Sequence, residues 1–289
     1  MKRFLIFIFA LFATIETFAT GQDGDLIFVD GEMWVLLGKP LRADSLLFSS
    51  LKNILPKDRS TFSSNWDGYT GYWSIKNDKL VLDSIKVTID KYDTYKELYK
   101  EWEESIPSSD MQKVFKSYYD KDDIIASWLT GTIRIGKGRW ITYLHQGFLR
   151  NQEYEQFIAI DRGNVTGRKS YHNKVVVDGF SFSMFKSREE IKAKFPLDFK
   201  SYPELDEENR ILFIIRDIQL DSLGNLLDCH VKASLPNQEE DRIQSLEGLE
   251  NSLKLMLKRI SPWKTLYING EYVSQDKYGS VIPYILKQP

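Results

Sequence analysis

Residues 211–233 decide the fold of the C-terminal part of the chain. Residues 211–220 (ILFIIRDIQL) are apolar and β-branched and end in alternation, which predicts a strand. Residues 221–225 (DSLGN) predict a turn, because Gly and Asn accept positive φ and Asp bonds its own backbone. Residues 226–233 (LLDCHVKA) predict the returning strand. The stretch therefore predicts an antiparallel hairpin.

A helix and further strands are expected after this hairpin. Six apolar residues at spacings of three and four predict the buried face of a helix: Leu246, Leu249, Leu253, Met256, Leu257 and Ile260. Pro262 ends that helix, and Trp263 follows it directly. Residues 263–273 and 278–286 predict strands, and Asn269-Gly270 predicts a turn.

This order of elements resembles the C-terminal domain of the TonB family over about residues 199–286. The matching positions are Tyr202-Pro203, Asp221 and Gly224, Trp263, Gly270 and Ile282-Pro283. The chain departs from the family at Thr265, where Pro is usual, and it lacks the Pro-rich periplasmic linker. Without that linker, the force transmission of the family has no path to this domain.

The resemblance implies a small α+β domain that binds an extended peptide by adding a strand to a sheet edge. Residues 278–286 are the expected edge, because Pro283 cannot donate to a ladder and favours an edge strand. Trp263, Tyr278 and Tyr284 are the candidate binding residues of this domain.

The N-terminal part is expected to be a meandering antiparallel sheet that carries two helices. Turn residues at 30–31, 77–78 and 136–138 separate strand-like runs, which predicts three hairpins. Capping-box residues at 94 and 97 precede an apolar stripe at helical spacing, as do those at 109 and 112. The pattern therefore predicts helices over 94–106 and 109–118.

A boundary is expected within residues 196–209, which hold two Pro and several acidic residues. The predicted fold class is α+β, with a β-rich domain of residues 25–195 and a TonB-like domain of residues 199–289. Residues 66–85, with Trp66, Gly68-Tyr69 and Trp73, also resemble an uncharacterised domain of Bacteroidetes proteins, as do residues 138–163. That second resemblance implies a fold and no activity.

The N-terminus has the layout of a secretory signal peptide over residues 1–20. Lys2-Arg3 precede the apolar run 4–15, and Thr17-Phe18-Ala19 offers a small-x-small cleavage site near Ala19. The run is short for a membrane span. An uncleaved anchor is the alternative, and it would be the chain's membrane contact. Either way, we expect an exported protein of the periplasm or cell envelope.

The composition argues against several classes of partner and cofactor. The net charge is −2, which gives no electrostatic footprint for nucleic acid. The three histidines, His145, His172 and His230, lack a partner at metal-ligand spacing. Residues 131–138 (GTIRIGKG) lack the pattern of a phosphate loop. We therefore expect no nucleic-acid partner, no cofactor and no metal. The single cysteine, Cys229, is expected to be a buried apolar group.

An aromatic cluster is the candidate binding surface of the N-terminal domain: Trp66, Tyr69, Tyr72 and Trp73. Exposed rings supply large contact area with a polar handle, as carbohydrate and peptide surfaces require. The alternative is that Tyr69 and Trp73 simply cover a small sheet.

These observations favour a non-enzymatic envelope protein whose C-terminal domain binds a protein partner. No catalytic residue is singled out. One alternative is an envelope glycan hydrolase that uses carboxylates of the N-terminal domain. The carboxylates in question occur in charge-rich runs that are expected to be solvated: Glu103, Glu104, Asp120, Asp122 and Asp123. A second alternative is an immunity or inhibitor protein that binds a co-encoded partner.

Overall fold

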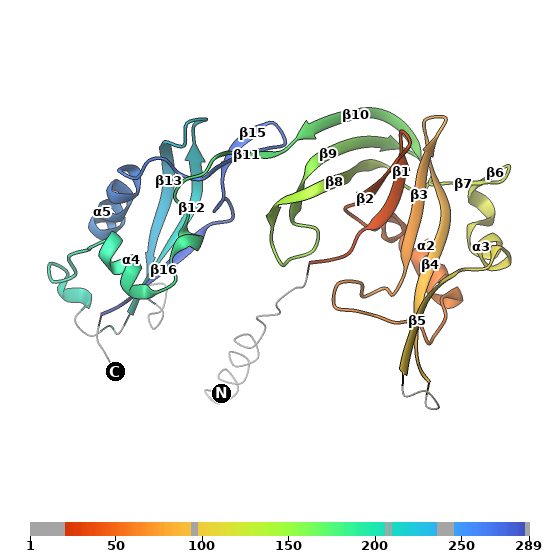
Figure 1. Ribbon diagram of the computed structural model, residues 1–289, viewed down its shortest axis with the longest axis horizontal. Coiled ribbons are helices and arrows are strands. Elements are labelled where there is room, and N and C mark those ends of the chain that lie inside the picture. Colours follow the sequence, from red (N-terminus) through yellow and green to blue (C-terminus); the bar gives the residue numbers. More distant parts are fainter. Residues whose placement is uncertain (1–20, 94–97, 206–207, 209, 236–245, 287–289) are drawn as a thin grey trace, which may run out of the picture. The chain divides into compact units, whose positions relative to one another are not determined.

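The computed structural model describes residues 21–93, 98–205, 208, 210–235 and 246–286. They form a mixed α and β structure in which strands predominate, which agrees with the α+β class at that coarse level. The chain divides into two compact units, Met1–Tyr171 and His172–Pro289 (Figure 1). The predicted signal peptide lies outside the described residues. Within the described part, no helix is long and apolar enough to span a membrane.

The first unit is built on one curved sheet with the strand order β10-β9-β8-β2-β1-β3-β4-β7-β6, and β5 pairs with β4 (Figure 1). Asn164 of β10 also pairs with Lys79 of β4, so the path from β10 to β4 returns on itself. The strands are β1 Asp25–Val29, β2 Glu32–Leu36, β3 Thr70–Lys76, β4 Lys79–Asp93, β5 Leu98–Ser105, β6 Tyr119–Asp120, β7 Asp123–Ile125, β8 Gly131–Tyr143, β9 Arg150–Asp161 and β10 Asn164–His172.

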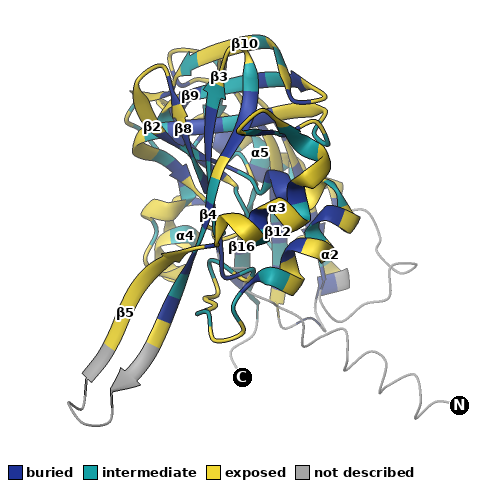
Figure 2. Ribbon diagram, turned by 90° about the vertical axis from the view of Figure 1, so that its right-hand side faces the viewer, coloured by how far each residue is buried: buried dark blue, intermediate teal, exposed yellow. Residues whose placement is uncertain are grey.

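Two helices of this unit pack apolar faces onto the core of the sheet (Figure 2). Helix α2, Ser45–Ile54, begins where the Asp44 carboxylate accepts the backbone N–H groups of Leu46 and Leu47. Helix α3, Ser108–Phe115, lies within the predicted range 109–118 except for its first residue.

The helix predicted over 94–106 is wrong where the structure describes it. Residues 98–105 form β5, which pairs with β4 from Asp93 opposite Leu98 to Lys86 opposite Ser105. The β4 side of this ladder contains a β-branched run, Val87, Thr88 and Ile89, that favours strand over helix. Pairing along its whole length satisfies the β5 backbone groups that point toward β4 and overrides the local helical pattern. Residues 94–97 lie outside the described residues.

A buried carboxylate, that of Asp25, connects several segments in the core of the first unit through hydrogen bonds. Asp25 is 0% exposed. Its oxygens accept hydrogen bonds from Lys39 Nζ at 2.8 Å, the Gly71 N–H at 3.0 Å and Trp73 Nε1 at 2.9 Å. Lys39 Nζ also donates to the carbonyl oxygen of Tyr69 at 2.9 Å. Because a buried charge is costly without partners, these four contacts specify how β1, β3 and the segment after β2 meet.

Replacing Asp25 with Ala leaves the Lys39 ammonium buried without its carboxylate. We expect the free energy of unfolding to fall by roughly 3–5 kcal/mol. The matched control is Asp120→Ala, which removes a surface ion pair with Lys79 at 2.7 Å and should lower the free energy of unfolding far less, because solvent screens exposed ion pairs. Urea unfolding of both variants measures the difference. Equal losses in the two variants would contradict the structural role of Asp25.

The second unit contains two small sheets. One has the order β13-β12-β16 and the other β11-β14-β15. Helix α5, Glu247–Lys258, buries Leu249, Leu253 and Leu257 in the core of the first of these sheets. The remaining elements are β11 Lys174–Val177, α4 Arg188–Lys194, β12 Arg210–Leu220, β13 Leu226–Ser234, β14 Thr265–Ile268, β15 Glu271–Ser274 and β16 Ser280–Ile285. The predicted hairpin of residues 211–233 is confirmed as the β12–β13 pair.

Trp263 anchors the core of this unit. It is fully buried, with the ring of Phe180 at 4.7 Å and that of Phe182 at 5.8 Å between centroids. The backbone N–H of Trp263 donates to the carbonyl oxygen of Gly224 in the β12–β13 turn at 2.7 Å. Phe180 and Phe182 precede the boundary expected at 196–209, yet they pack within the second unit.

Gly224 is required at its position for two reasons. Its φ is +83°, and a Cβ there would lie 2.7 Å from the carbonyl oxygen of Trp263. We expect Gly224→Ala to lower the free energy of unfolding by more than about 1 kcal/mol. Leu223→Ala alters an exposed neighbour in the same turn and should change it by no more than about 0.5 kcal/mol. Thermal unfolding of both variants is the measurement, and a neutral Gly224→Ala would refute the requirement.

Candidate functional site

The strand β16 forms one edge of the sheet β13-β12-β16, and in the described part of the chain no other strand pairs with its outer side. In an antiparallel ladder, both backbone polar groups of a residue point to the same neighbour, and successive residues alternate. Ala233 lies opposite Phe213, but its N–H donates to Glu250 Oε1 of α5 at 2.8 Å. Phe213 therefore directs its polar groups to its other neighbour, Ile282 of β16.

The alternation assigns the outward-facing backbone of β16. Since Ile282 faces β12, so does Tyr284, whereas Val281, Pro283 and Ile285 point their backbone groups away from the sheet. Two further observations agree with this assignment. Pro283 has no N–H to donate to β12. The carbonyl oxygen of Ile285 accepts a hydrogen bond from Lys192 Nζ of α4 at 3.2 Å.

The two edge strands of this sheet, β13 and β16, differ in how their outward backbone groups are covered. On the β13 edge, Glu250 occupies the N–H of Ala233, and α5 packs along that strand. On the β16 edge, the Lys192 ammonium occupies one carbonyl, and Pro283 removes one donor. The remaining outward groups of β16 are the N–H and C=O of Val281, the C=O of Pro283 and the N–H of Ile285. This edge can therefore accept main-chain hydrogen bonds from an added strand.

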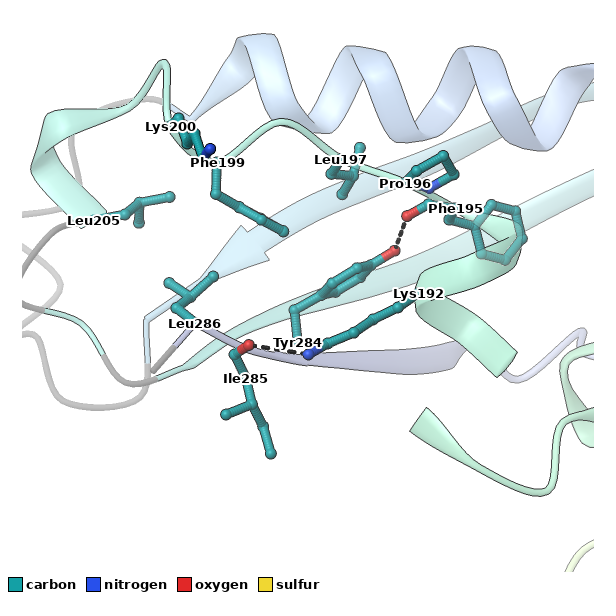
Figure 3. A pocket seen from close by; sticks show the side chains of 10 residues that line it. All are labelled: Lys192, Phe195, Pro196, Leu197, Phe199, Lys200, Leu205, Tyr284, Ile285 and Leu286. Atoms are coloured by element: carbon teal, nitrogen blue, oxygen red, sulfur yellow. Dashed lines mark hydrogen bonds between the residues drawn. The ribbon is translucent and has the colours of Figure 1, made fainter. Parts of the chain in front are cut away.

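A pocket of about 370 Å³ opens beside the end of β16 (Figure 3). Its walls come from α4, the segment after α4, Leu205 and β16. The lining residues are Lys192, Phe195, Pro196, Leu197, Phe199, Lys200, Leu205, Tyr284, Ile285 and Leu286. They are mainly apolar and include two lysines and no acidic residue.

Tyr284 fastens the pocket wall to the sheet. Its hydroxyl donates to the carbonyl oxygen of Phe195 at 2.7 Å (Figure 3). Burial raises the pKa of Tyr284, so the phenol stays protonated and remains a donor. Its ring meets those of Phe199 and Phe213 at centroid distances of 5.3 and 5.6 Å. The residue thus positions the segment that lines the pocket.

The candidate binding residues of the C-terminal part fall into different environments. Trp263 lies in the core, away from solvent. Tyr284 is also buried, and it shapes the pocket wall. Tyr278, 51% exposed, precedes β16 on the surface. Lys192, Lys200 and Glu250 were not singled out from the sequence, because a lysine or glutamate in a charged run carries no mark of the strand edge that it will meet.

The aromatic residues proposed as a surface of the N-terminal part do not share one environment. Tyr69 and Trp73 are buried in the core, as the covering alternative expects. Tyr72 is half-buried beneath Lys86, whose Nζ lies 4.5 Å from the ring centroid. Trp66 is the exposed member, at 67%. The four rings therefore do not form one exposed surface.

Four of the five carboxylates considered for hydrolysis make surface contacts: Glu103, Glu104, Asp120 and Asp123. Asp120 pairs with Lys79, and Asp123 with Lys76. Lys79 also holds the pKa of Asp120 below its usual range, whereas a catalytic acid needs a raised pKa. Burial raises the pKa of the Cys229 thiol, which keeps it protonated. Within the described residues, no group of three or more His, Cys, Asp or Glu side chains could hold a metal ion.

Replacing Tyr284 with Phe removes the hydroxyl and leaves the Phe195 carbonyl buried without this donor. We expect the free energy of unfolding to fall by about 1–2 kcal/mol. Tyr272→Phe, which removes a hydroxyl from a largely exposed ring of the same unit, is the control and should be nearly neutral. Urea unfolding compares the two variants. If both are neutral, Tyr284 does not fasten the pocket wall.

Comparisons with known proteins add no relative. No protein-family model, curated protein or solved structure matches the chain. The resemblance of the C-terminal part to the TonB family therefore stays a prediction. The features that bear on function are the strand edge, the adjacent pocket and their charges.

Proposed function

We propose that the protein is a non-enzymatic, exported protein of the cell envelope that binds an extended segment of a partner protein along β16. The observation that carries the proposal is the orientation of the β16 backbone. Val281 offers a donor and an acceptor to the outside, Pro283 an acceptor and Ile285 a donor. The backbone of an added strand would form hydrogen bonds with these groups.

Side-chain selection would come from the adjacent pocket. Main-chain hydrogen bonds are the same for every peptide, so they supply affinity with little discrimination. In an added strand, alternate side chains point to the same face, and one of them could enter the apolar pocket beside Tyr284 and Leu286. The pocket therefore favours a partner segment with a large apolar residue.

Charge adds a second element of selection. Lys192 and Lys200 line the pocket, and no lining residue is acidic. A carboxylate on the partner segment would be attracted to these ammonium groups and would be steered there before contact. We therefore propose an extended segment that carries an acidic residue close to its apolar anchor.

The proposal is tested by removing the one complete backbone donor–acceptor pair of the edge. Val281→Pro deletes an outward N–H and should abolish strand addition while retaining the β12–β16 ladder. Val281→Thr keeps the N–H, is also β-branched and serves as the matched control. Full-length protein with a photo-cross-linking residue in place of Tyr278 is irradiated in its native envelope, in wild-type, Pro and Thr backgrounds.

We expect one adduct that maps to an acidic, extended segment of a single envelope protein. It should persist in the Thr variant and fall at least about tenfold in the Pro variant, the loss expected from one or two backbone hydrogen bonds. Circular dichroism and thermal unfolding must show that both variants are folded. An adduct that survives in a folded Pro variant would refute strand addition at β16.

A further inference from the structure

A second pocket lies in the first unit, where the β8–β9 ladder is irregular. The register shifts between Lys137 and Trp140 and again between Trp140 and Thr142. Such bulges interrupt pairing and redirect side chains, and they occur often beside functional sites. The pocket has a volume of about 240 Å³, and its walls include Asp23, Trp140, Arg150 and Gln152.

Arg150 is a buried cation that Asp23 attracts, but it forms no ion pair within the described part of the chain. The residue is 6% exposed and lines the pocket, and its Nε is buried with no hydrogen-bond partner. Among the described residues, no carboxylate makes an ion pair with it. Burial lowers the pKa of Arg150, which expresses the cost of keeping the guanidinium away from water. An anion in the pocket would offset that cost.

A buried carboxylate on the same strand as Arg150 has other hydrogen-bond partners. Glu155 is fully buried and accepts hydrogen bonds from Asn151 Nδ2 at 3.1 Å and from the Gln152 N–H at 2.9 Å. The Thr142 hydroxyl in turn donates to Asn151 Oδ1 at 2.9 Å. This network fixes the backbone on the C-terminal side of Arg150 and leaves the guanidinium for the pocket. The site is therefore pre-organised on two strands.

Trp140, which lines the pocket, belongs to a stacked pair of aromatic rings. Trp140 is 58% exposed and stacks on Tyr143 with centroids 4.8 Å apart and planes 7° from parallel. The Arg150 Cζ lies 5.9 Å from the centroid of the Trp140 ring. A flat apolar surface of this kind suits the face of a ring-shaped ligand.

We propose that this pocket binds a small ligand that carries a single carboxylate on a ring. The planar guanidinium of Arg150 would hold the carboxylate through paired hydrogen bonds, and Trp140 would stack on the ring. Asp23, an exposed carboxylate at the pocket wall, attracts Arg150 and repels anions in proportion to their charge, so it disfavours phosphate more than a monocarboxylate. The proposal is independent of strand addition at β16.

Binding to the full-length protein is measured by calorimetry with four probes: glucuronate, benzoate, glucose and inorganic phosphate. We expect glucuronate, benzoate or both to bind at least tenfold more tightly than glucose and phosphate. Binding of glucuronate alone identifies a sugar acid, and binding of benzoate alone identifies an aromatic acid. If neither carboxylate binds, or if phosphate or glucose binds as tightly, the proposal is overturned.

Three variants separate a binding role from a structural one. Arg150→Met should weaken binding at least about tenfold, the loss of a charge-assisted hydrogen bond, while the melting temperature stays level or rises because a buried unpaired charge is removed. Trp140→Ala, at an exposed position, should weaken binding severalfold. Trp66→Ala removes another exposed tryptophan of the same unit and should leave binding unchanged.

Two outcomes with these variants would overturn the assignment. One is unchanged affinity in Trp140→Ala together with unchanged affinity in Arg150→Met. The other is a large fall in melting temperature for Arg150→Met with unchanged affinity in Trp140→Ala, which would make Arg150 a structural residue.

Discussion

The surface of the second unit depends on one constraint, the alternation of backbone hydrogen bonds along β12. Each residue of a central strand serves one neighbour with both of its polar groups. The Ala233 N–H points to Glu250 and away from β12, so Phe213 must bond to β16. The register of the three strands thus decides which residues of β16 direct their backbone groups outward.

The two units differ in how the backbone groups at the edges of their sheets are paired or covered. In the first unit, Asn164 of β10 pairs with Lys79 of β4, so the sheet returns on itself at this point. In the second unit, the sheet stays open and is only partly protected, by Glu250 at one edge and by Lys192 and Pro283 at the other. An edge kept open in this way is the physical basis for proposing that β16 receives a partner.

The first unit also contains two buried charged side chains that differ in their ion-pair partners. Asp25 accepts hydrogen bonds from three donors, including its counter-ion Lys39, so its role is structural. Arg150 is almost as deeply buried, makes no ion pair with the described residues and lines a pocket. Burial of a charge costs the same kind of free energy in both places. Asp23 attracts Arg150 but does not outweigh its burial, so its pKa is still lowered, which is why this second charge suggests a ligand.

Sequence patterns determined several elements whose formation depends on neighbouring residues. The hairpin predicted at 136–138 is wrong, because residues 131–143 form the single strand β8, which pairs with β9. The β12–β13 hairpin follows from an apolar run, a turn that needs Gly224 and a second run, and α5 follows from its spacing of leucines. Tertiary structure decided the rest. The local helical pattern at 98–105 is overridden by pairing with β4. Tyr69 and Trp73 are buried in the core, where they contact the rings of Phe48 and Trp128, residues far from them in the sequence. The outward groups of β16 and the isolation of Arg150 depend on contacts between residues far apart in the chain, and no local pattern encodes such contacts.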